Sequence, residues 1–354
     1  MNDADAFLLL ERMVRIPSPS YEEGPIAEFL VSELSQLGFD AHIDEVGNFV
    51  ASIGDGSPHG VLLGHIDTVG GTPLVHITDG VLWGRGTVDA KGPFACFIAA
   101  TARAHAEGRL PGRVTLVGCV EEEAPSSKGA RHIAPLLAPD WCIIGEPSGW
   151  DRVTLGYKGH IAATLVHERE TTHTAHAEIS AATHACRTWS SIENAATEFN
   201  TERPKLYDQL LPHLAHVESS DDGILQRAEL KLALRLPENV PPARARAWLA
   251  ELAPDFELDS SEGLPAWSGP RTGSLARHLS RAIAKHDGRP TFQRKTGTAD
   301  LNIVAPAWGC PAVAYGPGDA TFDHRPDEHV ELAEFARGIA VLTEFLANSE
   351  AVVG

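Results

Sequence analysis

The 354-residue sequence lacks the features of secreted, membrane-spanning and nucleic-acid-binding proteins. Its first residues, MNDADAFLLLERMVR, are acidic where a signal peptide is basic, and no apolar run approaches the length of a membrane span. Its 29 Lys and Arg residues are outnumbered by 48 Asp and Glu residues, so a net charge of −19 repels phosphate backbones. We therefore expect a cytoplasmic protein without a nucleic-acid or membrane partner.

Cysteine is also scarce, and its spacing is uninformative. The five cysteines are odd in number, widely separated and mostly within apolar runs, and no two form a C-x-x-C pair. They predict reduced core residues of a cytosolic protein. Low-complexity tracts and short-period repeats are absent as well. What remains is an ordinary globular composition, whose length favours two domains or one domain with a large insertion.

Apolar runs without polar alternation predict strands that are buried on both faces, as in a mostly parallel sheet. These runs are Val61–Leu63, Val114–Val120, Trp141–Ile144 and Ala312–Tyr315. Amphipathic patterns between or before them predict helices at Ala4–Arg15, Gly24–Leu37 and Pro93–Glu107. The alternation predicts an α/β fold in which helices flank the sheet.

The pattern changes between residues 158 and 267. A strand near Arg152–His167, a helix near Ala177–Phe199, an alternating strand Gln226–Leu236 and a helix Pro242–Leu252 follow one another. This order predicts a small inserted α+β domain, after which a helix at Thr272–His286 returns the chain to the first domain. We therefore expect one domain formed by residues 1–157 and 268–354, and an inserted domain formed by residues 158–267.

Side chains that can bind metal directly follow three of the predicted strands. His65 and Asp67 follow the first, Glu121 to Glu123 follow the second, and Glu146 follows the third. Ligands bind beyond the carboxyl ends of the strands in open parallel sheets, so these groups are expected to converge on one crevice. Asp67 lies two residues after His65, on the same face of an extended segment, where it can orient a metal-binding imidazole. Alone, this His-x-Asp pair more often marks a strand end followed by a turn.

Two further acidic features have both a structural and a metal-binding interpretation. Asp89 lies in a Gly-rich turn before a predicted helix, where a helix-capping aspartate is as plausible as a carboxylate that bridges two cations. The three successive glutamates at 121–123 cost free energy unless cations or water neutralise them. A solvated acidic loop is the alternative for that triplet.

In this order, the motifs resemble the M20 family of dinuclear zinc peptidases and deacylases, which includes acetylornithine deacetylase and succinyl-diaminopimelate desuccinylase. The resemblance covers nearly the whole chain and is carried by residues 64–67, 84–92, 122–123, 145–148, 297–300 and 323–324. It implies a zinc-exopeptidase-like catalytic domain and an inserted lid domain that forms a homodimer. It also implies a cis peptide bond between Asp89 and Ala90.

The resemblance implies a set of site residues as well. Two divalent metal ions are expected, zinc with cobalt as an alternative. One would be bound by His65, Asp89 and Glu146, and the other by Asp89, Glu123 and His324. Glu122 would act as the general base, with Asp67 orienting His65. Glu121 stands where the family usually has Asp, which leaves the register of base and ligand open by one residue.

Residues outside the metal centre are matched by the same resemblance. His173 corresponds to a lid histidine that stabilises the oxyanion, although His176 and His184 compete for this role and a solvent-facing histidine is the alternative interpretation. Arg235 corresponds to a lid arginine that grips a substrate carboxylate, and a surface ion pair is its alternative interpretation. Thr298 and Asp300 are expected to line the substrate pocket and support the site.

Within the family, residues 121–129, 144–151 and 154–159 look most like the branch that releases lysine, and sometimes ornithine, from an amino-group carrier protein. That branch implies hydrolysis of the isopeptide bond between the carrier's C-terminal glutamate side chain and the lysine α-amino group. A deacylase of small N-acyl amino acids, such as acetylornithine, is the alternative enzyme. A non-catalytic metal-binding protein of the same fold is an alternative of another class.

Overall fold

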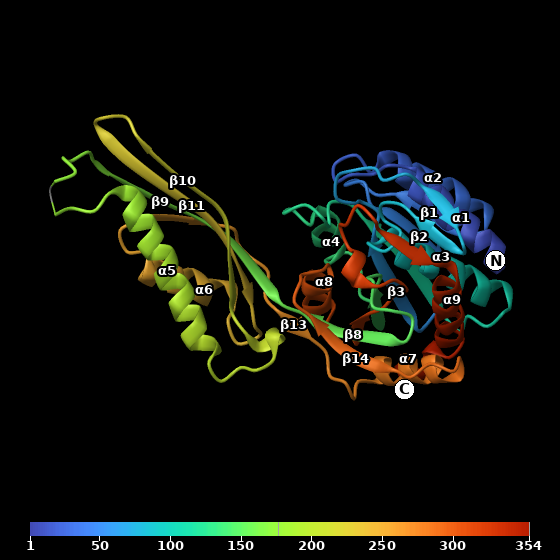
Figure 1. The fold of residues 1–354 in the computed structure, drawn as a ribbon. Coiled ribbons are helices and arrows are strands. Elements are labelled where there is room, and N and C mark those ends of the chain that lie inside the picture. The colour runs from blue at the N-terminus through green and yellow to red at the C-terminus, as the bar shows by residue number, and fades with distance from the viewer. Residues whose placement is uncertain (176, 354) are drawn as a thin grey trace. The chain divides into compact units, whose positions relative to one another are not determined.

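The computed structural model describes residues 1–175 and 177–353, which form two compact units (Figure 1). Unit 1 comprises Met1–Gly156, Ser268–Arg294 and the chain from Ala299 onward. Unit 2 comprises Tyr157–Trp267 and the short segment Lys295–Thr298. Among the described residues, no helix combines the length and the apolar character that crossing a membrane requires.

Unit 1 is built on a mixed sheet in the order β1-β2-β6-β3-β7-β15-β8-β13, and β14 also pairs with β8. Its strands are β1 (Asp40–Ile43), β2 (Phe49–Ile53), β3 (His59–His65), β6 (Arg113–Cys119), β7 (Trp141–Ile144), β8 (Arg152–Tyr157), β13 (Trp267–Ser268), β14 (Thr291–Lys295) and β15 (Ala312–Ala314). The central strands β6, β3, β7 and β15 are mutually parallel. They are buried along almost their whole length, as strands covered on both faces must be, which confirms the predicted α/β fold.

The helices of unit 1 pack their apolar faces against this sheet and one another. They are α1 (Asp3–Arg15), α2 (Gly24–Gln36), α3 (Lys91–Ala106), α4 (Lys128–Ile133), α7 (Ser274–Lys285), α8 (Leu301–Trp308) and α9 (Leu332–Leu346), with the 3₁₀ turns η2 (Ala320–Phe322) and η3 (Ser349–Val352). Helix α3 is buried on nearly all sides and lies against α1, α9 and β3. The helix therefore brings the turn that precedes it, with Asp89, to the sheet.

A second, small sheet joins two loops of unit 1. Its strands are β4 (His76–Thr78), β5 (Val81–Trp83) and β16 (His329–Glu331), in the order β16-β5-β4. The antiparallel pair β16 and β5 aligns His329 with Trp83. Because β5 runs directly into the Gly84–Gly92 turn and β16 follows His324 closely, this pairing brings the two loops together.

Unit 2 is a four-stranded antiparallel sheet in the order β10-β11-β9-β12, and Figure 1 shows its two long helices along one face. Its elements are β9 (Gly159–Glu170), α5 (Ala181–Asn200), η1 (Leu206–Asp208), β10 (Leu211–Asp221), β11 (Leu225–Leu236), α6 (Pro242–Leu252) and β12 (Glu257–Ser260). Alternate residues of β9 and β11, such as Ile161, Leu165, Leu230 and Leu234, are fully buried under the helices.

Two sequence expectations need correction. The single strand expected over Arg152–His167 is two strands, β8 and β9, in different sheets, because the chain leaves unit 1 at Tyr157. The cysteines are all free, but only Cys96, Cys119 and Cys142 are core residues, whereas Cys186 is exposed on α5 and Cys310 is partly exposed.

Candidate metal centre

The candidate ligands lie at the carboxyl ends of neighbouring parallel strands. His65 is the last residue of β3, Glu121 to Glu123 begin two residues after β6, and Glu146 lies two residues after β7. Strands β6 and β7 are the two neighbours of β3 in the sheet. The sheet therefore collects these side chains along a single edge.

Two of these residues, together with Asp89 from the turn before α3, form a group whose geometry fits a metal ion. Nitrogen and oxygen atoms of His65, Asp89 and Glu123 all lie within 4.8 Å of one another. The Nε2 atom of His65 is 3.1 Å from Oδ1 of Asp89, and Nε2 of His324 is 3.1 Å from Oδ2 of the same carboxylate. Asp89 thus presents one oxygen to each imidazole. A carboxylate that bridges two cations needs this arrangement.

Asp67 fixes the orientation of His65 through the Nδ1 side of the ring. The Nδ1 atom of His65 donates a hydrogen bond to the carbonyl oxygen of Asp67 at 2.9 Å and lies 3.3 Å from its Oδ1. This contact assigns the proton to Nδ1 and leaves Nε2 to face Asp89. Burial acts to raise the pKa of Asp67, but the contact with His65 and the hydrogen bond from Ser20 keep that pKa below its usual value.

The same carboxylate anchors the glutamate loop. The backbone N–H groups of Glu122 and Glu123 donate to the two oxygens of Asp67 at 3.1 and 3.0 Å. Glu121 adopts a left-handed φ of 57°, and its side chain is bound by Ser126 at 2.6 Å and by Lys128 at 3.3 Å. Glu121 is therefore occupied by its own loop, while Oε1 of Glu123 lies 3.0 Å from His324.

Negative charge is concentrated around this group to an unusual degree. Burial raises the pKa of Glu122 well above its usual value, and although His65 opposes this shift, Asp300, Glu146 and Glu123 add to it. Asp300 is 2% exposed, and the donor beside its carboxylate is the buried thiol of Cys119. Burial raises the pKa of Asp300 to about 7, against the effect of His65. Buried carboxylates at this density require compensating positive charge.

The imidazoles respond to the same field. Hydrogen bonds to Asp89 and Glu123 raise the pKa of His324 to about 10, whereas its partial burial opposes the shift. Burial also opposes charge on His65, yet the contacts with Asp67 and Asp89 raise its pKa well above the usual value. The site thus favours cations at the positions of these protons. Its mixed imidazole and carboxylate donors are those that bind zinc, cobalt or manganese.

The structure of the Asp89 turn excludes one of the two interpretations of the sequence, that of a helix-capping aspartate. The N-cap of α3 is Ala90, and no side chain caps that end, so Asp89 has no capping role. The Asp89–Ala90 peptide bond is cis, which confirms that prediction. At Gly92, an added Cβ would lie 2.1 Å from the carbonyl oxygen of Thr87, so only glycine fits this tight turn.

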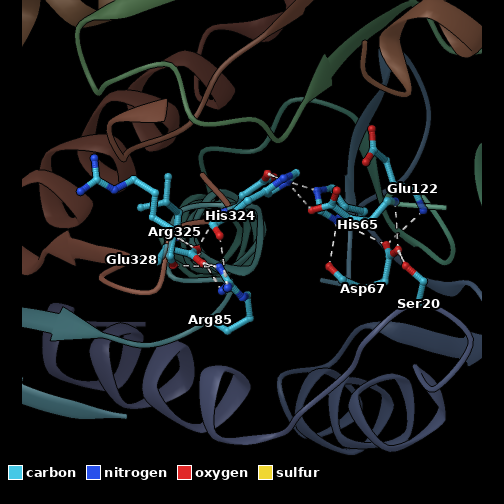
Figure 2. A network of polar contacts seen from close by, with 12 residues as sticks. Ser20, His65, Asp67, Arg85, Glu122, His324, Arg325 and Glu328 are labelled. Carbon is cyan, nitrogen blue, oxygen red and sulfur yellow. Dashed lines mark hydrogen bonds and ion pairs between the residues drawn. The ribbon is translucent and has the colours of Figure 1, made fainter. Parts of the chain in front are cut away.

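Glu328 is a residue of the site that the sequence analysis missed. It is 1% exposed, and its Oε1 accepts the backbone N–H groups of Gly86, Val88 and Asp89 at 2.9, 2.9 and 3.1 Å. Its Oε2 forms an ion pair with Arg85 at 2.7 Å. Figure 2 shows this pair beside His324, whose carbonyl oxygen accepts a hydrogen bond from Arg85 at 3.4 Å. Glu328 therefore ties the Asp89 turn to the His324 loop, and no spacing in the sequence signals that role.

The histidines proposed for the oxyanion belong to unit 2. His173 is exposed in the segment between β9 and α5, and its Nδ1 accepts the backbone N–H of Ala175 at 3.1 Å. Its competitor His176 lies outside the described residues. His184 is engaged within unit 2, since its ring lies 4.5 Å from that of His167 and its Nε2 lies 3.4 Å from Asp255.

Two of the predicted substrate residues are in contact with each other in unit 2. A guanidinium nitrogen of Arg235 donates to the hydroxyl of Thr298 at 3.1 Å. Arg235 lies on β11 opposite His160 of β9, and the pKa of His160 is lowered to about 4 by burial and by this arginine. Asp300, by contrast, belongs to unit 1.

Comparisons with known proteins find the same group of enzymes at the level of family, sequence and fold. Residues 61–348 match the model of peptidase family M20/M25/M40. A Deinococcus radiodurans protein named LysW-lysine hydrolase is 42% identical over 96% of this chain and 96% of its own. Succinyl-diaminopimelate desuccinylase of Stenotrophomonas maltophilia is 28% identical over 90% of this chain and 92% of its own.

A solved structure agrees with these matches at the level of the fold. The metallo-carboxypeptidase Sso-CP2 of Sulfolobus solfataricus superimposes with a TM-score of 0.79 at 17% identity. The alignment covers 98% of this chain and 99% of that one, so the two folds correspond over their full length.

Proposed function

Because the chain belongs to the M20 family of peptidases, and so hydrolyses amide bonds, we propose that it releases L-lysine from the C-terminal glutamate of an amino-group carrier protein. It would do so as a cytoplasmic enzyme of lysine biosynthesis. The observation that carries the chemistry is the Asp89 carboxylate between two imidazoles, with Glu122 on the adjacent loop. The substrate class is supported by 42% identity to a LysW-lysine hydrolase along almost the whole chain.

The proposed centre binds two divalent ions, zinc with cobalt as the alternative. His65, Asp89 and Glu146 would hold one, while Asp89, Glu123 and His324 would hold the other. When bound, the ions supply Lewis-acid polarisation of the scissile carbonyl and a lowered pKa for the attacking water. Asp67 keeps His65 in the tautomer that this role requires, and Glu328 keeps the Asp89 turn in place.

Glu122 is the proposed general base. Its carboxylate takes the proton of the attacking water and delivers it to the departing lysine α-nitrogen, so a single group acts as base and then as acid. Burial among other carboxylates raises the pKa of Glu122 and so its affinity for the proton that it accepts. Its backbone N–H is bound to buried Asp67, which limits the movement of the loop during the reaction.

Unit 2 is the proposed lid, and we expect it to form a homodimer. His173 would stabilise the oxyanion, and Arg235 would bind a carboxylate of the substrate with Thr298 beside it. The hydrogen bond between Arg235 and Thr298 supports treating them as one binding element. Asp300, which belongs to unit 1, would support the metal centre.

A deacylase of small N-acyl amino acids is the second candidate, which is favoured by the 28% identity to succinyl-diaminopimelate desuccinylase. A direct competition separates the two. The enzyme is stripped with a chelator, reloaded with zinc or cobalt, and assayed on carrier-linked lysine, N-acetylornithine and N-succinyl-diaminopimelate. We expect lysine release from the carrier only, lost on chelation and restored by metal. Faster turnover of either small substrate would reject the carrier assignment, and no turnover of any substrate would favour a non-catalytic protein.

A further inference from the structure

Positive charge is concentrated in one segment of unit 1. Residues Ser268–Arg294 contain six of the chain's 29 Lys and Arg residues but one of its 48 Asp and Glu residues. This segment comprises α7, the loop that follows it and most of β14, shown in orange in Figure 1. It is therefore basic within a protein whose net charge is −19.

The fold directs these charges outward. Helix α7 buries Leu275, Leu279 and Ile283 against the core, so Arg277 and Arg281, one turn apart, lie together on the opposite side. Arg271 precedes the helix and Arg289 follows it, and both are also exposed. We refer to Arg271, Arg277, Arg281 and Arg289 as the arginine surface.

None of these four arginines has a carboxylate within ion-pair distance anywhere in the described parts of the chain. Neighbouring Lys285 differs, because it pairs with Glu344 at 2.7 Å. Arg271 lies 4.8 Å from the ring of Phe292, and Arg281 lies 3.4 Å from Nε2 of His278. Without carboxylate partners, these four like charges repel one another. They also lower the magnitude of the net charge, so solubility does not explain them either.

We propose that the arginine surface is the docking site for an acidic face of the protein that carries the lysine, an inference that rests on the proposed function. A substrate attached to a protein can be positioned by contacts far from the scissile bond. Guanidinium groups bind carboxylates through paired hydrogen bonds, and opposite charges accelerate the encounter of two proteins. An acidic carrier would otherwise be repelled by an enzyme of the same sign.

The arginine surface is joined to the candidate metal centre through Trp150. This residue follows Glu146 by four positions, and an added Cβ at Gly288, next to Arg289, would lie 2.9 Å from its ring. Exposed Arg337 stacks on the same ring at 4.8 Å. The loop that carries Arg289 therefore packs against the segment that carries a candidate ligand.

A compact acidic protein fits this surface better than a nucleic acid does. An extended chain of phosphates would continue past the arginines onto a surface on which acidic residues outnumber basic ones. A small acidic protein can contact the arginine surface without extending onto the acidic surface around it.

The test combines Arg277→Glu with Arg289→Glu, since neither side chain has a hydrogen bond or ion pair within the described residues. We expect KM for carrier-linked lysine to rise roughly tenfold or more, with kcat nearly unchanged, because long-range attraction and docking contacts are lost. The dipeptide γ-glutamyl-lysine has the same scissile bond without the carrier, and its turnover should not change. The salt dependence of kcat/KM on the carrier should also become weaker.

A matched control has the same change in charge at other exposed positions, Arg113→Glu with Lys205→Glu. An equal rise in KM for the control would attribute the effect to net charge and overturn the proposal, as would an unchanged KM for the Arg277 and Arg289 variant. An RNA oligonucleotide that binds the wild type but not this variant, with unchanged KM for the carrier, would assign the surface to nucleic acid. If the wild type cleaves the dipeptide but not carrier-linked lysine, the proposed function fails and the docking site fails with it.

Discussion

The candidate residues of the two units are held by very different amounts of structure. In unit 1, the buried carboxylates of Asp67 and Glu328 together accept five backbone N–H groups from the two loops that present the candidate ligands. In unit 2, His173 is exposed, and its Nδ1 accepts a hydrogen bond from the backbone of Ala175, two residues away. From this contrast we expect the proposed metal centre to be preorganised, and the proposed lid residues to be ordered when substrate binds.

The largest effect is expected at Glu122, in the loop that Asp67 anchors. Glu122→Gln keeps the shape of the side chain and the backbone hydrogen bond to Asp67 but removes the proton acceptor. We expect turnover of carrier-linked lysine to fall by about 10²–10⁴-fold, the usual contribution of a general base. The metal content, measured by elemental analysis, should be unchanged. Retained turnover would reject Glu122 as the general base, and with it the expected difference between the two units.

The neighbouring residue provides the control. Glu121→Gln alters an adjacent carboxylate that is bound by Ser126 and Lys128 and not by the metal group. Its turnover should remain within a few-fold of the wild type. A loss as large as that of Glu122→Gln would shift the base by one position, to the residue that replaces the family's usual Asp.

A smaller effect is expected in the lid, and it should fall on one histidine only. His173→Ala should lower kcat by about 10²-fold, as the loss of an oxyanion donor does, with little change in the thermal midpoint. His184→Ala should lower the thermal midpoint and leave kcat nearly unchanged, because His184 packs on His167 and Phe256. Paired kcat and thermal-melting measurements decide between the two histidines. A loss of kcat confined to His184→Ala would show that the lid residue had been assigned to the wrong histidine.

Glu328 offers a test of preorganisation itself. Glu328→Gln removes the ion pair with Arg85 and weakens the acceptor for the Asp89 turn, without changing the size of the side chain. We expect metal affinity to fall by about 10–100-fold and activity to recover in excess metal, since Glu328 acts through the position of Asp89. Metal titration with an activity readout measures both. Exposed Glu331→Gln, three residues further on, is the matched control.

The parts of the fold that followed from sequence are those determined locally. Strand β7 and helix α6 have the predicted bounds, because one is a short apolar run between polar residues and the other starts with proline. Edge strand β10 was missed, since its residues are mostly exposed and it lacks an apolar face. The strands β4, β5 and β16 are three residues each, too short for any periodic pattern.

The site residues also fall into those that could be predicted from the sequence and those that could not. Its candidate ligands occupy strand ends and motifs that can be recognised in the sequence, so a resemblance was enough to name them. Glu328 could not be found in this way, because its partners are backbone N–H groups about 240 positions away in the chain. The direction of Glu121 depends on a left-handed backbone at a residue that rarely adopts one. Both features depend on tertiary structure rather than on residue type.

The smallest effect concerns His160, a partly buried histidine of unit 2 that lies opposite Arg235. Its folded pKa of about 4 lies below the usual value, because burial and Arg235 disfavour the charged ring. Below about pH 6.5 the unfolded chain therefore binds a proton that the folded state does not bind until about pH 4, so the free energy of unfolding decreases as the pH falls. This contribution is fully present above pH 6.5.

The prediction can be measured as a difference between two proteins. Relative to His160→Gln, the wild type should lose about 1–2 kcal/mol of unfolding free energy between about pH 7.5 and pH 5. Urea midpoints at each pH provide the difference, and an NMR titration of the ring measures the folded pKa directly. Acid effects at the candidate metal centre are common to both proteins and cancel. A ring that titrates near 6.5 would contradict the burial of His160 beside Arg235 and would remove this contribution to the stability of unit 2.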